Sequence, residues 1–453
     1  MSRLPKSYKD NKVCIMGLGY VGLTLAVTMA DIGFEVHGVE IKDDILKSLK
    51  KGVPHFHEPG LEGTLKKVLL TKNLKLSKKI PKKIDSNVYI ITVGTPINFS
   101  KKVRTDMIFS VSEEISNFIK EDDLIILRST VEPGTTNKVC KEIFNKRNIN
   151  YNIAFCPERT LEGTAMKELR SLPQIIGADN LEVRIRCAQL FSFITPTVVQ
   201  VSKIETAELI KLVDNCQRDV QFALANEVAQ ISDLIGVSAN EVIKAGKLAY
   251  PRTQLPIPGP VGGPCLEKDS YILESALKNK KFSPKIIMSA RKVNEAQPRL
   301  VINQLKKLLM KNKDFPKKIN IVVAGVAFKG EPETNDLRGT MAKPIIKELE
   351  TNFPSSNIRI YDPIVTKKEI NSVFSKEICR NLKQSFVDTS LYLIVNNHKI
   401  FSKLPISNYS NLMKKPGIIF DFWNNFSSQN LLYPNGIRYI GLGEIGLNIM
   451  EKN

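Results

Sequence analysis

The sequence has few cysteines for its length, and none of them stands in a Cys-x-x-Cys pair. Seven cysteines are scattered over 453 residues, an odd number that does not suit a disulfide framework. No spacing typical of zinc ligands occurs either. We therefore expect a protein of the reducing cytoplasm that needs no metal ion.

Long apolar segments are also missing. No run of apolar residues approaches the ~20 that a membrane span requires, and the first ten residues are too polar for a signal peptide. The sequence also lacks heptads, short repeats and low-complexity tracts. These absences favour a soluble globular protein that makes no membrane contact.

The charge is far from balanced, with a formal net charge of +20 at pH 7. Such an excess suits nucleic acid, an anionic membrane surface or anionic small ligands. The lysines are dispersed, however, and no basic helix with interleaved aromatic residues occurs. We expect most lysines to cover solvated surfaces and part of the excess to attract dianionic substrates. Nucleic-acid binding rests on net charge alone, and we expect no such partner.

The first motif lies near the N-terminus. Residues 12–41 read as an apolar strand, a Gly17-x-Gly19-x-x-Gly22 turn, an apolar helix and a second strand that ends at Glu40. In a dinucleotide-binding fold the first glycine allows the tight turn, the second admits the pyrophosphate, and the third lets the helix pack on the strand. The helix N-terminus offers N–H groups to phosphate, and the carboxylate binds ribose hydroxyls. A turn without a ligand is the alternative. The expected dinucleotide-binding positions are Gly17, Gly19, Tyr20, Val21, Gly22 and Glu40.

Two further apolar strands break into polar residues. One ends in Gly94-Thr95-Pro96 and the other in Ser129-Thr130. Ligands of open parallel sheets lie beyond the carboxyl ends of the strands, so Thr95 and Thr130 are candidates to meet the cofactor. A plain turn or helix cap is the alternative for each of them.

A pair of acids follows in residues 154–163. Glu158 and Glu162 are four residues apart and would share a face if the segment were helical. Paired carboxylates transfer protons when a dry environment perturbs them. Two solvated loop acids are the alternative.

A long helical pattern without proline or glycine runs from Glu205 to Ile235, where Gly236 is a natural stop. It would span roughly 45 Å, which suits a helix that bridges two lobes or forms a dimer interface. Lys211 and Asn215 are neighbours on one face, and a lysine with an amide can stabilise an oxyanion. An exposed lysine beside an asparagine is the alternative.

The most distinctive stretch covers residues 256–270. It sets Cys265 between a glycine pair at 262–263 and the dipeptide Lys268-Asp269. Glycine lets a backbone approach a ligand closely, and a nearby ammonium favours the thiolate that attacks carbonyl carbon. Asp269 can hold a water or the lysine. An inert buried cysteine in a Gly-Pro turn is the alternative.

The remainder predicts a second sheet. We expect shorter helices after the cysteine, one of them over 286–293, and a charged break at 312–318. Apolar strands then return at 318–330, 357–363, 391–395 and 417–421, without a second glycine motif. The expected fold class is α/β, with two Rossmann-like doubly wound domains joined by a central helical domain that contains the long helix. The expected domains are 1–203 for the dinucleotide, 204–311 for the helices and the cysteine, and 312–453 for the second α/β unit.

Together these motifs resemble the UDP-glucose/GDP-mannose dehydrogenase family, the nucleotide-sugar 6-dehydrogenases, over nearly the whole chain. The most specific match is Gly-Gly-Pro-Cys-Leu-Glu-Lys-Asp at 262–269. The other matches are Ala-Glu-Leu-Ile-Lys at 207–211 with Asn215, Ser-Thr-Val-Glu-Pro-Gly at 129–134, Cys-Pro-Glu-Arg at 156–159, and Phe-Lys-Gly at 328–330 with Asp-Leu-Arg at 336–338. The resemblance implies that a homodimer oxidises the C6 alcohol of a UDP-sugar twice, to the uronic acid, with NAD as cofactor.

The resemblance also implies roles for individual residues. Cys265 would add to the C6 aldehyde as a thiohemiacetal, and a second hydride transfer would leave a thioester that water hydrolyses. The implied catalytic residues are Cys265, Lys211, Asn215, Asp269, Glu158 and Thr130. The implied further cofactor contacts are Thr95, Thr130, Lys268 and Arg338. The implied substrate contacts, with the nucleotide on the C-terminal domain, are Glu158, Arg159, Glu162, Lys211, Arg252, Gly262, Phe328 and Lys329.

The motifs are divided over the sugar. Lys268 resembles the UDP-glucose enzymes, although Leu266 replaces the Phe that many of them carry. Residues 156–159, 218–227 and 250–252 look more like the UDP-N-acetylhexosamine branch, in which arginines could donate to an acetamido carbonyl. We expect UDP-N-acetyl-D-mannosamine or another UDP-N-acetylhexosamine, for surface polysaccharide precursors. UDP-glucose is the alternative, and a nucleotide-binding protein without turnover is the alternative of another class.

Overall fold

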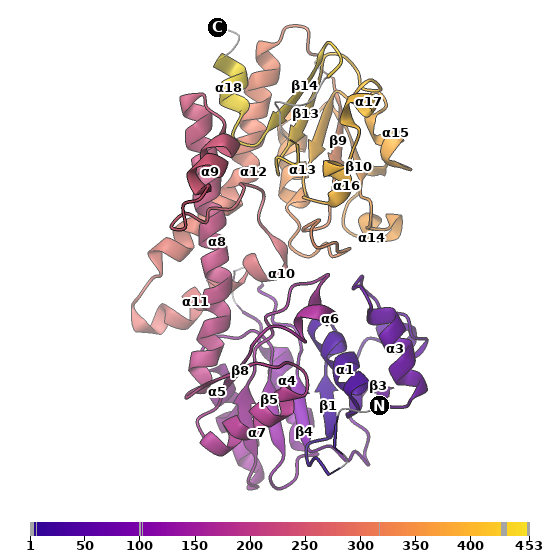
Figure 1. Cartoon of the computed structure of the whole chain (residues 1–453), viewed down its shortest axis with the longest axis vertical. Coiled ribbons are helices and arrows are strands. Elements are labelled where there is room, and N and C mark those ends of the chain that lie inside the picture. Colours follow the sequence, from indigo (N-terminus) through magenta and orange to yellow (C-terminus); the bar gives the residue numbers. More distant parts are fainter. Residues whose placement is uncertain are drawn as a thin grey trace. The chain divides into compact units, whose positions relative to one another are not determined.

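A computed structural model describes residues 4–450 except 6, 99, 100, 102, 317 and 427–432. The chain divides into two compact units, of which the first comprises residues 1–214 with 271–283 and the second residues 215–270 with 284–453. Figure 1 colours the chain in sequence order. Each unit contains one sheet, and the two units are described separately.

The first unit is built on an eight-stranded sheet in the order β3-β2-β1-β4-β5-β6-β7-β8. Neighbouring strands are parallel except β6 and β7, which are antiparallel. The strands are β1 (Lys12–Met16), β2 (Glu35–Val39), β3 (Leu74–Ser77), β4 (Val88–Ile91), β5 (Leu124–Leu127), β6 (Asn152–Phe155), β7 (Gln174–Gly177) and β8 (Val198–Val201). The helices are α1 (Tyr20–Ile32), α2 (Asp43–Lys50), α3 (Leu61–Leu70), α4 (Asp106–Ser116), α5 (Thr135–Glu142), α6 (Ala165–Glu168) and α7 (Leu181–Ser192), with 3-10 turns at Phe144–Arg147 and Lys278–Lys280.

The buried side chains of β1 explain why helices cover both faces of this sheet. Consecutive residues of a strand point to opposite faces. Val13 and Ile15 belong to one apolar cluster, whereas Cys14 and Met16 belong to another. All four are at most 1% exposed. A strand that is apolar on both faces is typical of a doubly wound parallel sheet, and α1 packs beside α3 on one side of it (Figure 1).

The second unit contains a six-stranded parallel sheet in the order β11-β10-β9-β12-β13-β14. This order corresponds to that of the first six strands of the other sheet, so the predicted pair of Rossmann-like domains is confirmed. The strands are β9 (Asn320–Ala324), β10 (Asn357–Tyr361), β11 (Glu377–Ile378), β12 (Leu391–Ile394), β13 (Gly417–Asp421) and β14 (Ile437–Gly441). The helices are α9 (Ala239–Lys247), α10 (Gly263–Leu266), α12 (Lys285–Lys311), α13 (Ala342–Asn352), α14 (Lys367–Asn371), α15 (Leu382–Phe386), α16 (Lys399–Ser402), α17 (Ile406–Ser410) and α18 (Ile445–Met450). The sequence did not predict β11 and β14.

Two helices, α8 (Ile204–Ile235) and α11 (Asp269–Leu277), begin in one unit and end in the other. The predicted long helix is confirmed to within one residue, because α8 has 32 residues and ends before Gly236. Gly236 has φ +83°, and its N–H and that of Val237 both donate to Ser232 O. This left-handed glycine stops the helix as predicted. Among the described helices, none combines the length and the apolar character that crossing a membrane requires.

The prediction of shorter helices after the cysteine holds for α11, which has nine residues, but not for the helix expected at 286–293. A single helix, α12, runs for 27 residues with Pro298 inside it. An internal proline costs a helix about 3 kcal/mol. Val301, Ile302 and Leu305 are at most 3% exposed on a face that packs against α13. Because each such side chain stabilises by about 1.5–3 kcal/mol when buried, packing outweighs the proline, and the helix ends next to the predicted break at 312–318.

Candidate functional site

The turn between β1 and α1 has the geometry predicted for its three glycines. Gly17 has φ +92°, a conformation that side chains rarely adopt. A Cβ on Gly22 would lie 1.8 Å from Gly17 O, so only glycine lets the helix pack this closely. A Cβ on Gly19 would meet no described atom within 4 Å. No side chain caps the first turn of α1, which leaves N–H groups to bind a phosphate.

The two residues after Gly19 begin the helix. Tyr20 and Val21 are half-buried, and the ring of Tyr20 stacks on that of Phe56 with 3.9 Å between the centroids. The stack holds the first residue of α1 in one orientation, beside the open surface at Gly19.

Glu40 follows β2 directly and is 7% exposed. Its Oε2 accepts the N–H of Leu18 at 3.0 Å, and its Oε1 accepts the N–H of Lys42 at 3.0 Å. The first bond fixes the carboxylate against the glycine turn. Each carboxylate oxygen has a second lone pair, with which a ribose hydroxyl can be bound. Lys42 lies past the end of the strand, at the N-cap of α2.

The polar residues that follow β4 and β5 lie together. Thr95 Oγ1 donates to Thr130 O at 2.6 Å, and Ser129 Oγ donates to Val93 O at 2.6 Å. The two loops therefore support one another at the carboxyl edge of the sheet, the edge at which cofactors of such sheets bind.

Glu158 is held by an arginine that the sequence interpretation overlooked. Arg128 Nη2 donates to Glu158 Oε2 at 2.7 Å, and Glu158 Oε1 accepts the N–H groups of Arg159 and Thr160 at 2.8 and 2.9 Å. Burial acts to raise the pKa of Glu158, but the Arg128 guanidinium and these N–H donors outweigh it and hold the pKa below its ordinary value. Glu158 is therefore a carboxylate at neutral pH.

A sequence signal for Arg128 was available. Arg128 directly follows the fully apolar strand β5, a position at which burial is expected. A buried arginine requires an anionic partner. In the structure Arg128 is indeed only 2% exposed. The sequence analysis paired Glu158 with Glu162 on the condition that the segment was helical, and this condition is not met. Residues 156–161 form a loop, so Glu158 and Glu162 do not share a helical face. The backbone of that loop is used instead to bind the Glu158 carboxylate.

In the second unit, Cys265 lies on the short helix α10. It is the exposed member of the seven cysteines, of which the other six are buried or half-buried. Gly263 has φ +90°, and its N–H donates to Gly339 O at 2.8 Å. A Cβ on Gly263 would lie 2.4 Å from the ring of Phe328, and one on Gly262 would lie 2.2 Å from Gly339 O. The glycine pair thus allows the cysteine turn to pack closely against residues 328–339.

Asp269, four residues after the cysteine, is 1% exposed. Its Oδ2 accepts from Asn215 Nδ2 at 2.6 Å and its Oδ1 from Lys268 Nζ at 2.8 Å. The sequence analysis allowed for the contact between Asp269 and Lys268, but it did not predict the one between Asp269 and Asn215. One N–H of Asn215 is used by Asp269, and the amide nitrogen carries a second. The ammonium of Lys268 is shared with the carboxylate.

Two further predicted residues, Lys329 and Arg338, have contacts within residues 328–339. Lys329 is half-buried with its ammonium 5.5 Å from the centroid of the Phe328 ring. Arg338 forms an ion pair with Asp336, with 2.6 Å between Nη2 and Oδ2. Both residues belong to the 328–339 segment that meets the cysteine turn.

The arginines predicted for the sugar lie in different units. Arg159 Nε donates to Asp214 Oδ2 at 3.0 Å. Arg252 is exposed, 5.6 Å from the centroid of the Tyr250 ring, in a loop whose neighbours line a cavity of about 850 Å³. Lys211 is half-buried on α8, one turn before Asn215.

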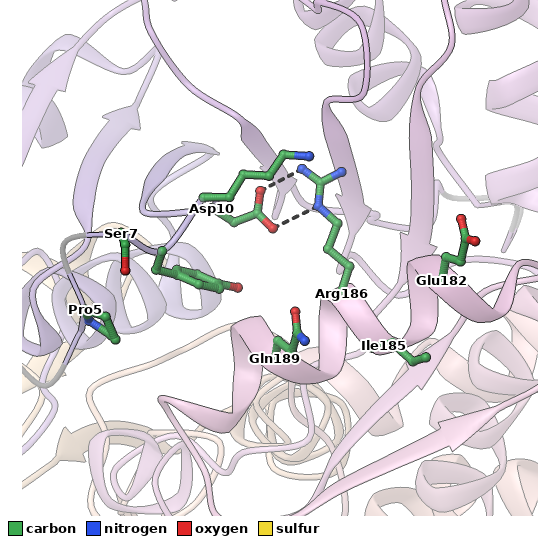
Figure 2. Close-up of a pocket in the computed structure, with 9 residues that line it drawn as sticks. Pro5, Ser7, Asp10, Glu182, Ile185, Arg186 and Gln189 are labelled. Atoms are coloured by element: carbon green, nitrogen blue, oxygen red, sulfur yellow. Dashed lines mark hydrogen bonds and ion pairs between the residues drawn. The ribbon is translucent and has the colours of Figure 1, made fainter.

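Another cavity, of about 540 Å³, is drawn in Figure 2. Arg186 of α7 reaches Asp10 there, with 2.8 Å between Nε and Oδ2 and 2.6 Å between Nη2 and Oδ1. Asp10 precedes β1, whereas the glycine turn follows it. This cavity is therefore at the amino end of β1, opposite the candidate cofactor site. In the described part of the chain, no three His, Cys, Asp or Glu side chains lie close enough to hold a metal ion.

Sequence models of the UDP-glucose/GDP-mannose dehydrogenase family match three segments of the chain. Its NAD binding domain matches residues 11–195, its central domain residues 205–296, and its UDP binding domain residues 322–428. The first segment contains the glycine turn, the second contains the cysteine turn, and the third contains strands β10 to β13 of the second sheet.

Named relatives and solved structures are also similar. The chain is 34% identical, over 96% of its length and 97% of the relative, to the UDP-N-acetyl-D-mannosamine dehydrogenase of Methanococcus vannielii. The structure of the UDP-D-ManNAc dehydrogenase of Pyrococcus horikoshii superposes with a TM-score of 0.84 at 29% identity, covering 96% of this chain and 100% of that one. The Staphylococcus aureus UDP-N-acetyl-mannosamine dehydrogenase gives 0.82 at 28%, covering 97% and 100%. A UDP-glucose dehydrogenase of Pyrobaculum islandicum, at 21% identity, shares the fold with a TM-score of 0.82, covering 97% and 99%.

Proposed function

We propose a substrate and a role for each site residue from the premise that the chain belongs to the UDP-glucose/GDP-mannose dehydrogenase family. The protein is an NAD-dependent UDP-sugar dehydrogenase. We propose that its substrate is UDP-N-acetyl-D-mannosamine, oxidised at C6 to the uronic acid for a surface polysaccharide precursor. The observation that carries a covalent mechanism is the exposed Cys265 on a turn fixed by two glycines, beside the buried Asp269.

NAD, when bound, accepts the hydride of each oxidation. The residues that would hold it are those of the glycine turn, Glu40 and the two threonines, because the surface at Gly19 is open and the N–H groups of α1 are uncapped by side chains. Lys268 and Arg338 are proposed as further contacts. The rest of the chemistry belongs to side chains of this protein.

Cys265 would attack the C6 aldehyde through its sulfur, forming a C–S bond and an oxyanion that becomes a thiohemiacetal. Lys211 and the second N–H of Asn215 would stabilise that oxyanion. Oxidation of this adduct gives a thioester, from which attack by water releases the carboxylate and returns the thiolate. Asp269 would take up the protons released, and the ionised Glu158 would orient the water beside Thr130.

The sugar proposal predicts a ranking of substrates. The kcat/KM for UDP-N-acetyl-D-mannosamine should exceed that for UDP-glucose by about ten- to a hundredfold, because donors meant for the acetamido carbonyl cost about 1–3 kcal/mol each when left unpaired. Arg252→Ala should narrow this ratio, since Arg252 is proposed as one such donor. NADH formation with UDP-N-acetyl-D-mannosamine, UDP-N-acetylglucosamine and UDP-glucose measures both effects. A wild-type enzyme that prefers UDP-glucose would refute the sugar assignment and leave the dehydrogenase intact.

The position of Glu40 predicts a preference for NAD+ over NADP+. Its carboxylate is fixed where the free ribose hydroxyls are bound and would repel a 2′-phosphate. Glu40→Ser should reduce kcat/KM for NAD+ and raise it for NADP+. Lys42→Ser serves as the control, because Lys42 contributes a backbone N–H that the substitution keeps. Equal kcat/KM of the wild-type enzyme for the two cofactors would contradict the role given to Glu40.

The same premise extends to assembly and organisation. We propose a homodimer formed along α8, in which Leu224, Ile231 and Ile235 lie on one stripe and are 52%, 49% and 64% exposed. Light scattering should give twice the monomer mass, and Ile231→Glu should lower it. We also propose a cytoplasmic location, supported by seven cysteines none of which is in a disulfide. The three domains 1–203, 204–311 and 312–453 are proposed as well, supported by the three matched segments.

A further inference from the structure

One arginine lies beneath the cysteine turn with 1% of its surface exposed. Arg291 Nη1 donates to Leu266 O at 2.8 Å and to Asp219 Oδ1 at 3.0 Å, and its Nη2 donates to Val261 O at 3.2 Å. Leu266 directly follows Cys265, and Val261 precedes it by four residues. A single guanidinium therefore forms hydrogen bonds to the backbone on both sides of Cys265.

A second anchor lies further back on the same loop. Asn226 of α8 donates through Nδ2 to Gly259 O at 3.0 Å, and its Oδ1 accepts the Gly259 N–H at 3.0 Å. Its amide nitrogen also donates to Asn294 Oδ1 at 2.9 Å, while Gln297 Nε2 donates to its Oδ1 at 2.8 Å. Asn226 thus pairs with the loop backbone as a strand neighbour would, and α12 fixes its orientation.

Asp219 joins the two anchors. Asn294 Nδ2 donates to its Oδ1 at 2.8 Å and to its backbone O at 2.9 Å, and Ser270 Oγ donates to its Oδ2 at 3.5 Å. Asp219 and Arg291 are each 1% exposed. Burial raises the pKa of Asp219, and the Arg291 guanidinium opposes that effect.

A pair buried this deeply is a weak source of stability, because desolvation offsets the attraction and apolar side chains of the same size often stabilise as well. Such a network instead fixes the orientation of the groups it bonds, since each polar group accepts only a few arrangements of its hydrogen-bond partners. Its partners here are the backbone atoms around Cys265. The site described above makes no use of these side chains, although Asp219 and Asn226 fall in the 218–227 stretch singled out by the sequence.

We propose that Asp219, Asn226, Arg291 and Asn294, which we call the Arg291 network, are positioning residues that hold the Cys265 sulfur in line for attack. The consequence for turnover rests on the proposed function. A displacement of about 1 Å at a reacting centre can cost on the order of a hundredfold in rate. The described contacts of the network are with the turn and with neighbouring residues of α11 and α12, none of which is proposed to hold the cofactor. The network should therefore affect the step that uses the sulfur and not the binding of the cofactor.

The test compares Arg291→Lys and Asn226→Ala with Arg186→Lys. Lysine keeps the charge opposite Asp219 but lacks the fork needed to reach Val261 O and Leu266 O together. Arg186→Lys alters another arginine–aspartate pair, which lines the cavity of Figure 2 and is remote in the fold from the cofactor edge of its sheet. It is expected to lower the melting temperature only.

Three readouts separate positioning from stability. The first is the rate of alkylation of Cys265 by iodoacetamide, followed by peptide mass spectrometry. The second is the fluorescence of Trp423, the single tryptophan, whose ring would lie 2.8 Å from a Cβ on Gly259. The third is the separation of kcat from KM for NAD+. The first two need no substrate and decide the proposal even if UDP-N-acetyl-D-mannosamine is not turned over.

For the folded network variants we expect kcat to fall about ten- to a hundredfold, with KM for NAD+ nearly unchanged. Alkylation should change severalfold and the Trp423 emission should shift. If Arg291→Lys does not fold, Asn226→Ala carries the same comparison. A folded Arg291→Lys or Asn226→Ala enzyme with wild-type alkylation, Trp423 emission and kcat would overturn the proposal, as would an equal loss of kcat in Arg186→Lys.

Discussion

Cys265→Ser is expected to abolish steady-state formation of the uronic acid while leaving NAD+ binding nearly unchanged. A serine hydroxyl is a poorer nucleophile than a thiolate at neutral pH, and its ester releases the product more slowly than a thioester. Removal of a covalent nucleophile typically costs on the order of 10³-fold or more in turnover. Because the Cys265 side chain is exposed, the fold should lose little stability.

Steady-state NADH formation and calorimetric titration with NAD+ measure the two halves of this expectation. Cys140→Ser is the matched control, since Cys140 is a half-buried cysteine of α5 and is not among the proposed catalytic, cofactor-binding or substrate-binding residues. Full turnover by the Cys265→Ser enzyme would rule out the covalent role. Loss of NAD+ binding in that variant would show instead that the substitution disturbs the fold.

Local patterns predicted those parts of the molecule whose geometry local chemistry determines. The glycine turn could be located because each of its three positions excludes a side chain or leaves room for a phosphate. The end of α8 could be located because Gly236 adopts a left-handed conformation that other residues avoid. The alternation of buried residues along β1 and β9 likewise follows from strand geometry.

Contacts between distant residues could not be predicted in the same way. Asn215 and Asp269 were each assigned a role, but their hydrogen bond joins residues 54 positions apart. Helix α12 continues past Pro298 because it packs against α13, and the helix propensities of its own residues carry no information about that packing. Glu158 and Glu162 would have shared a face of a helix, but the segment is a loop whose backbone N–H groups bind the Glu158 carboxylate.

Arg128→Met is expected to move the acid limb of the pH–rate profile upward and to lower kcat at pH 7 by roughly a hundredfold. In the wild-type protein Arg128 holds the pKa of Glu158 below its ordinary value. Without the guanidinium, burial is opposed only by two backbone N–H groups, so the pKa of Glu158 should rise above that value. Protonated Glu158 cannot orient the hydrolytic water as a carboxylate does, and turnover should fail at a pH where the wild-type enzyme is active.

The stability of the same variant should respond to pH with the opposite sign. The depressed pKa of Glu158 contributes wild-type stability above the unfolded pKa, which is lost as pH falls through the folded pKa. In Arg128→Met the raised pKa makes ionisation unfavourable, so stability should fall as pH rises, by about 3–5 kcal/mol relative to wild type at pH 7. Melting temperatures and kcat across the same pH range measure both effects. Arg104→Met is the control, because Arg104 and Asp106 are 54% and 56% exposed and such pairs contribute little. An acid limb at the wild-type position in a folded Arg128→Met enzyme would show that Glu158 does not act as a carboxylate in turnover.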